Sequence, residues 1–142
     1  MMRWRSDRGF TILEMMLASV LAGILLVAAY SSWRKYADQQ RLRYSVVQVA
    51  SSLRQGEERA KGERSQYTIT FTAASSTYVI RRVSGGYLEN TEMPSGVTVQ
   101  ASDTVTFSQF GVPDAAHTIT LQNSAGTKTA TIGAQGAVSY SQ

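Results

Sequence analysis

The hydrophobic and polar positions divide the chain into three stretches with different patterns. The first runs from Phe10 to Tyr30 and is mostly apolar, with Glu14 as its only charged residue. At about 1.5 Å per residue, a helix of this length reaches roughly 30 Å, the thickness of the hydrocarbon core of a bilayer. This stretch therefore predicts one transmembrane helix over residues 10–30.

The second stretch keeps a helical period after the apolar run ends. Its apolar residues follow one another at spacings of 4, 3, 4 and 7 and so share one side of a helix: Leu42, Val46, Val49, Leu53 and Ala60. This stripe is too short for a coiled-coil seam, so it favours packing of the helix on a β-rich head. Gly56 and Gly62 weaken the helix interior, and we expect this amphipathic continuation to cover residues 31–62.

The third stretch, residues 63–142, changes to a period of two, which is typical of half-buried strands. The alternating apolar residues are Tyr67, Ile69 and Phe71, then Val97 and Val99, Val105 and Phe107, Ile119 and Leu121, Ala130 and Ile132, and Val138 and Tyr140. Turn-forming residues separate them at 84–86, 94–96, 111–114, 124–126 and 133–136. The order of a long helix and then about seven short strands predicts an α+β fold.

The segment before the apolar run is short and basic. Residues 1–9 carry Arg3, Arg5 and Arg8, which favour the cytoplasmic side of a membrane. A secretory signal peptide would have a shorter apolar run followed by a small-residue cleavage site, and neither feature is present. The boundary between this basic segment and the apolar run lies instead at Gly9 and Phe10.

The residues from Gly9 to Glu14 resemble the prepilin signature of type IV pilins. Gly9 matches the last leader residue, Phe10 the first mature residue and Glu14 the fifth. The resemblance implies that a prepilin peptidase cuts between Gly9 and Phe10 and methylates the new amine of Phe10. It also implies that Glu14 pairs with the Phe10 amine of a neighbouring subunit.

Glu14 is unusual on physical grounds alone. An acid within a membrane helix costs roughly 2.5 to 3.5 kcal/mol on insertion scales and usually marks a function. The alternative is a protonated Glu14 that is tolerated because it lies close to the membrane interface.

The order of the elements resembles the H-type minor pseudopilin and FimT family, whose heads are antiparallel β-sandwiches packed on the helix. The phrases that carry this resemblance are Val105-Thr106-Phe107 leading to Gly111, Ile119-Thr120-Leu121, Thr131-Ile132, and Gly136 before the last strand. It implies a minor pilin or pseudopilin subunit of a type IV pilus or a type II secretion system. The implied partners are other such subunits, the prepilin peptidase, the inner-membrane assembly platform and membrane lipid.

The expected location is the inner membrane, crossed once, with the head outside the cytoplasm. This orientation follows from the leader resemblance, because basic residues lie on both sides of the apolar run: Arg3, Arg5 and Arg8 before it, and Arg34, Lys35, Arg41 and Arg43 after it.

The net charge of +4 raises a nucleic-acid alternative, but the excess lies beside the apolar run. Residues 34–64 carry eight basic and four acidic groups, and residues 65–142 carry three basic and four acidic groups. Some FimT-like minor pilins are DNA receptors that use a Gly-Arg-x-Arg pattern near the last strand, and residues 136–139 here read Gly-Ala-Val-Ser. A DNA-uptake role is therefore the alternative function, with Arg81, Arg82 and Lys128 as candidate contacts. Because Arg81 and Arg82 are adjacent in a strand, we expect them to face opposite sides.

Catalytic and metal-binding chemistry is not indicated. His117 is the only histidine, and although Asp114 and several serines lie nearby in sequence, no nucleophile-elbow signature accompanies it. We expect no enzyme activity and no cofactor, with His117 as an exposed residue at the entry of a strand. We also expect no metal site, because the acidic and amide side chains of the head lack EF-hand spacing: Glu89, Asn90, Glu92 and Asp103. The chain has no cysteine, so disulfides contribute nothing.

Overall fold

The computed structural model describes residues 10–141 of the chain. The expected leader, residues 1–9 with Gly9 at its end, lies outside the described residues. The chain divides into two units, one up to Arg34 and one from Lys35 onward, and each is described by itself.

One helix, α1, extends from Ile12 to Glu63. Thr11 caps its start, because its hydroxyl accepts a hydrogen bond of 3.2 Å from the backbone N–H of Glu14. The helix ends at Glu63, because the next residue, Arg64, adopts a left-handed conformation with φ 46°, and the Ser65 N–H donates to the Ala60 carbonyl at 3.2 Å. The observed end is one residue beyond the predicted end at Gly62.

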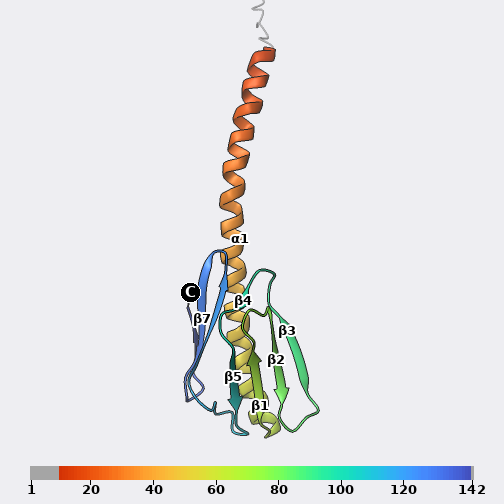
Figure 1. The fold of residues 1–142 in the computed structure, drawn as a ribbon, viewed down its shortest axis with the longest axis vertical. Helices are drawn as coiled ribbons and strands as arrows, with labels where there is room; N and C mark the ends of the chain where they lie inside the picture. The colour runs from red at the N-terminus through yellow and green to blue at the C-terminus, as the bar shows by residue number, and fades with distance from the viewer. Residues whose placement is uncertain (1–9, 142) are drawn as a thin grey trace, which may run out of the picture. The chain divides into compact units, whose positions relative to one another are not determined.

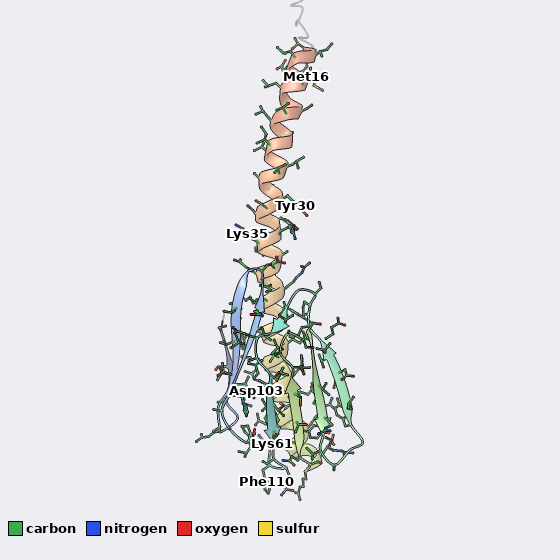
Figure 2. The ribbon with its side chains drawn as sticks, in the orientation of Figure 1. Met16, Tyr30, Lys35, Lys61, Asp103 and Phe110 are labelled. Carbon is green, nitrogen blue, oxygen red and sulfur yellow. The ribbon has the colours of Figure 1, made fainter. Side chains whose placement is uncertain are left out.

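The first unit consists of the apolar part of α1. The side chains from Ile12 to Trp33 are exposed. Among the described residues, α1 is the one helix that is long and apolar enough to cross a membrane by length and composition. Figure 2 shows side chains standing out around this part of the helix, Met16 and Tyr30 among them.

The second unit packs residues 35–63 of α1 on two antiparallel sheets (Figure 1). The first sheet has the order β3-β2-β1-β5 and the second has the order β4-β6-β7-β8. The strands are β1 Tyr67–Phe71, β2 Thr77–Arg82, β3 Leu88–Glu92, β4 Thr98–Val99, β5 Asp103–Phe107, β6 His117–Asn123, β7 Gly126–Ile132 and β8 Val138–Tyr140. The predicted α+β fold, with a long N-terminal helix on a head of antiparallel sheets, is confirmed.

The strand count differs from the prediction by one. The structure has eight strands where about seven were expected. Strand β3 was missed because it lies at the edge of its sheet and has no alternating apolar side. Leu88, the only large apolar residue in it, is exposed. Alternation of apolar and polar residues marks a strand only when one of its sides is buried.

The core forms where the helical stripe meets both sheets. All five residues of the predicted stripe are buried, at 3% exposure or less: Leu42, Val46, Val49, Leu53 and Ala60. In the first sheet, Ile69 lies opposite Ile80 of β2 and Val105 of β5, and all three are buried. In the second sheet, Ile119 lies opposite Ala130. Packing of the stripe on the head, predicted from the sequence, is confirmed.

Candidate functional site

The predicted assembly residues lie at the start of α1. Phe10 precedes the helix and is 77% exposed, and Glu14 lies in its first turn. A carboxylate there interacts favourably with the partial positive charge of the helix N-terminus. Among residues 10–141 the Glu14 carboxylate has no ion-pair partner.

Thr11 and Glu14 also have a local role at the helix start that was not predicted from the sequence. Their spacing, Thr-x-x-Glu, is that of a capping box, in which the threonine hydroxyl and the acid satisfy each other's backbone N–H groups. Within the described part of the chain, the Thr11 half of this box is formed and the reciprocal bond from the Glu14 carboxylate is not. The Glu14 carboxylate is therefore not used in capping and stays available for another partner.

The residues of the apolar run surround α1 with exposed hydrocarbon. The surface of residues 10–20 has open, largely apolar hollows lined by Phe10, Ile12, Met15, Met16 and Val20. Ser19 lies among them and its hydroxyl donates to the Met15 carbonyl at 2.8 Å, which satisfies it within the helix. This surface needs either lipid or other apolar helices around it, because exposed hydrocarbon of this extent is unfavourable in water.

The structure does not bring the three candidate DNA contacts together. Arg81 and Arg82 lie on β2 in the first sheet, whereas Lys128 lies on β7 in the second. Arg82 is already engaged, since its guanidinium lies 3.0 Å from Glu63 Oε2 and donates to the Gly85 carbonyl at 2.7 Å. Arg81 is exposed.

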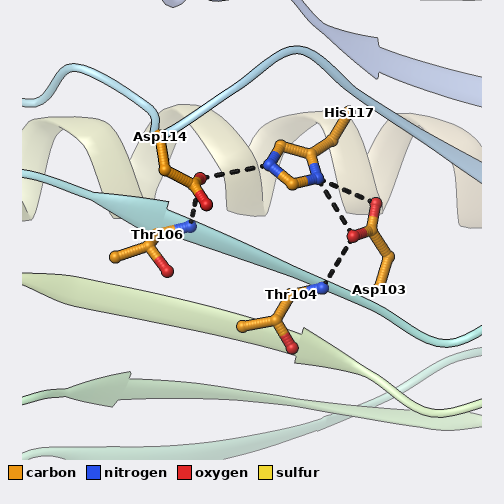
Figure 3. A network of polar contacts seen from close by, with 5 residues as sticks. All are labelled: Asp103, Thr104, Thr106, Asp114 and His117. Atoms are coloured by element: carbon orange, nitrogen blue, oxygen red, sulfur yellow. Dashed lines mark hydrogen bonds and ion pairs between the residues drawn. The ribbon is translucent and has the colours of Figure 1, made fainter.

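The expectation of an exposed His117 is wrong. Its side chain is only 13% exposed and lies between two carboxylates (Figure 3). Nδ1 is 3.0 Å from both oxygens of Asp103, and Nε2 is 3.1 Å from Oδ1 of Asp114. The placement at the start of a strand is confirmed, because β6 begins at His117.

This network joins the two sheets. Asp103 begins β5 of the first sheet and His117 begins β6 of the second, while Asp114 lies in the loop between these strands. A neutral imidazole has one N–H and donates to one of the two carboxylates, whereas an imidazolium donates to both. The i, i+3 spacing of Asp114 and His117 was visible in the sequence, but the contact with Asp103 depends on how the sheets pack.

Asp114 is held in its ionised form by its hydrogen bonds. Partial burial by itself raises the pKa of its carboxyl, but hydrogen bonds from the Thr106 N–H, from His117 and from its own N–H outweigh that effect. The pKa is therefore lower than its usual value of 3.8. In addition, the Asp114 N–H donates to the Thr106 carbonyl at 2.9 Å, so backbone and side chain together fix the loop to β5.

Within residues 10–141, no group of three or more His, Cys, Asp and Glu side chains is placed to hold an ion. Both ring nitrogens of His117 contact carboxylates. Through these contacts the network connects Asp103 of the first sheet with His117 of the second.

Comparison with known proteins gives one match. The family model described as "Prokaryotic N-terminal methylation motif" matches residues 4–30. This motif is a type IV prepilin-like leader, and it supports a type IV pilin-like protein. The motif implies processing by a prepilin peptidase and association with other pilin subunits. Together with the apolar part of α1, it agrees with a protein that crosses the inner membrane once. No curated protein and no solved structure matches the chain.

Proposed function

We propose that this pilin-like chain is a minor pilin or pseudopilin subunit of the H-type minor pseudopilin and FimT class. It would serve a type IV pilus or a type II secretion system as a structural subunit and not as an enzyme. The observation that carries the proposal is the methylation motif at residues 4–30, which includes the start of an apolar helix with exposed side chains.

In this proposal the chain has four parts with separate roles. The leader is residues 1–9, the membrane helix residues 10–30, the amphipathic continuation residues 31–62 and the extracytoplasmic head residues 63–142. The peptidase cuts between Gly9 and Phe10 and methylates the Phe10 amine. The arginines of the leader keep this site at the cytoplasmic side of the membrane.

Assembly follows from the chemistry of the new N-terminus. The cut creates a charged amine on Phe10, and Glu14 of a neighbouring subunit pairs with it in a low-dielectric environment, where such a pair is strong. The apolar helices then pack on one another as the filament leaves the lipid, guided by the assembly platform. The pair that Glu14 forms thus sets the register between neighbouring subunits.

The test is the intact mass and N-terminal residue of the chain isolated from its own membranes, with and without an active prepilin peptidase. We expect a chain that begins at N-methylated Phe10 only when the peptidase is active. A chain that keeps Met1, or that is cut within or after residues 10–30, would contradict the proposal.

The DNA-uptake alternative receives less support from the head. Its candidate cations lie on two sheets, and Arg82 is paired with Glu63. Useful affinity for DNA needs several phosphate contacts on one surface. A steep salt dependence of DNA binding by the full chain in detergent micelles, weakened by Arg81→Ala, would favour this alternative.

A further inference from the structure

A short turn after β5 presents an exposed aromatic side chain. In residues 108–112, the Gly111 N–H donates to the Ser108 carbonyl at 2.8 Å and the Ser108 N–H donates to the Val112 carbonyl at 2.9 Å. The Ser108 hydroxyl also accepts from the Val112 N–H at 3.2 Å. Phe110 at the tip is 71% exposed, more than any other large apolar side chain of the second unit's described residues. The hydrogen bonds of this turn therefore hold the Phe110 ring in a solvent-exposed position.

Phe110 borders a cleft at the end of the head where α1 ends. The cleft has a volume of about 500 Å³ and is lined by Lys61, Arg64, Gln109 and Phe110. Figure 2 shows Lys61 and Phe110 at this end. Gly111 suits the arrangement, because its φ of +75° is a left-handed conformation that favours glycine, and a Cβ there would require the Lys61 side chain to move. The stem of Lys61 thus packs on the turn that presents the ring.

Arg64 supplies the free charge of this cleft. Lys61 is paired with Glu57, whereas no carboxylate of residues 10–141 lies within ion-pairing distance of Arg64. Arg64 also has φ 46°, in the left-handed position after the helix where glycine is most favourable. A strained residue with an unpaired guanidinium beside an exposed ring is a feature that points to binding.

We propose that the cleft lined by Arg64 and Phe110 docks a different subunit of the filament, through a segment that carries a carboxylate beside an apolar side chain. This inference rests on the proposed function. Arg64 would bind the carboxylate in a two-pronged contact and Phe110 would bury the apolar neighbour, the combination of arginine and aromatic residue that is enriched at protein interfaces.

A second copy of this chain, stacked end to end, does not fit this cleft. The opposite end of the head has its own hollow of about 340 Å³, whose lining includes Arg43 and Lys128 and no acidic residue. End-to-end stacking of two copies would bring this basic hollow to the basic cleft, and like charges disfavour such a contact. End-to-end stacking is therefore disfavoured, and a different chain with an acidic contact surface fits the free charge of Arg64 better.

DNA is also disfavoured as the occupant. Arg64 is the only cation of the cleft that is free of an ion pair among the described residues, and several neutralised phosphates are needed for useful affinity. Residues 65–142 also carry more acidic than basic groups.

Site-directed photo-crosslinking in the native cells tests the proposal, because the chain has no cysteine of its own. Gln109→Cys places a maleimide-benzophenone probe in the cleft, and Gln100→Cys is the matched control at an exposed glutamine after β4. We expect position 109, and not position 100, to join the chain to a different pilin-like subunit at a peptide that contains Asp or Glu beside an apolar residue.

Two substitutions connect the crosslink to the cleft. Arg64→Gly removes the charge in a conformation that glycine adopts without strain, so the head keeps its stability while the crosslink yield falls at least tenfold. Phe110→Ala lowers the yield similarly. With Arg64→Glu the yield is lost, and changing the crosslinked carboxylate of the partner to Arg restores it.

Other outcomes overturn the inference. These are a crosslink to a second copy or to DNA, a yield that does not change in Arg64→Gly and Phe110→Ala, or no product at position 109 beyond that at position 100. The N-terminal residue and the filament content of the same samples are measured in parallel. A processed, assembled chain without the crosslink refutes the cleft alone, whereas an unprocessed chain refutes the proposed function as well.

Discussion

Gly56 lies in the buried helix stripe at a position where α1 faces side chains of the first sheet. It lies between Leu53 and Ala60 at helical spacing and is itself buried. A Cβ at this position would lie 2.9 Å from Cδ1 of Ile69 and 3.2 Å from Cε2 of Phe107. Both of those side chains are fully buried, so they have little room to move. A glycine that the sequence alone marks as a weak point of the helix is thus required by the packing.

Alanine substitutions at two helix glycines should have opposite effects on stability. Gly56→Ala gains about 1 kcal/mol in helix propensity but overpacks the core, and we expect a net loss of about 1–2 kcal/mol in the free energy of unfolding. Gly62→Ala has nothing within 4 Å of the added Cβ, so we expect a gain of up to about 1 kcal/mol. Denaturant unfolding of the full chain in detergent micelles measures both. Equal stabilisation by the two would contradict the close contact.

Asp114 should make the stability of the head depend on pH in the acid range. Its folded-state pKa is lowered, so its contribution is present above its unfolded-state pKa and is lost as the pH falls through the folded-state pKa, below 3.8. The side chain is 47% exposed, so solvent screening reduces the effect to about 0.5 kcal/mol. We therefore expect Asp114→Asn to be less stable than the unsubstituted chain at pH 7 by this amount.

The difference should shrink as the pH falls below 3.8. Unfolding of the full chain in micelles across pH 3–7 measures it, and Glu58→Gln, at an exposed helix position, is the control that should show no such trend. A difference that grew on acidification would mean that Asp114 is not the group responsible.

At the scale of elements, the second half of α1 is the central element of the head core. The Leu53 side chain lies within the main apolar cluster and has 0% exposure. We expect Leu53→Ala to lower the free energy of unfolding by about 2–5 kcal/mol, from lost burial and the cavity left behind. Glu58→Ala, on the exposed side of the same helix, should change it by less than about 0.5 kcal/mol. Hydrogen exchange of the strand amides gives a readout confined to the head.

The hairpin of β6 and β7 is tied to α1 by a polar contact that no periodicity predicts. Asn123 Nδ2 donates to the Asp38 carbonyl at 2.6 Å, and the Ser124 hydroxyl donates to Asp38 Oδ2 at 2.6 Å. Asp38 also lies 3.2 Å from the Arg41 guanidinium on its own helix. The turn at 124–126 was predicted from its residues, but the partner of that turn depends on the tertiary arrangement.

At the scale of the whole molecule, Glu14 should matter for assembly and not for insertion. Glu14→Ala removes an acid that disfavours membrane insertion, so the chain should still insert and be cut before Phe10. Loss of one partner from a buried ion pair costs about 3–5 kcal/mol, so we expect the amount of the chain in filaments to fall by more than about tenfold. Quantitative immunoblotting of sheared filaments against the membrane fraction measures it.

Two further variants test whether assembly depends on the charge of Glu14. Ser19→Ala changes a polar residue of the same helix that is satisfied internally, and assembly should be unaffected. Glu14→Gln keeps the size of the side chain without its charge and should behave like Glu14→Ala. Normal assembly of both Glu14 variants would leave the carboxylate without the proposed role.

The features that the sequence determined by itself are those that follow from neighbours along the chain. Helices and strands repeat at fixed periods, so residues that share a face are recognised from their spacing along the chain. Features of this kind are the apolar run, the stripe from Leu42 to Ala60, the predicted turns and the motif at residues 4–30. The edge strand β3 was not predicted, because its residue pattern lacks a buried side.

Only the tertiary structure decided which distant residues meet. It placed Asp103 and Asp114 on the two sides of His117, brought Gly56 against Ile69 and Phe107, and put Phe110 beside Arg64. Such contacts depend on strand order and on the packing of the two sheets about α1, and the energy of packing is shared among many residues that lie far apart in the chain. No short window of sequence contains that information.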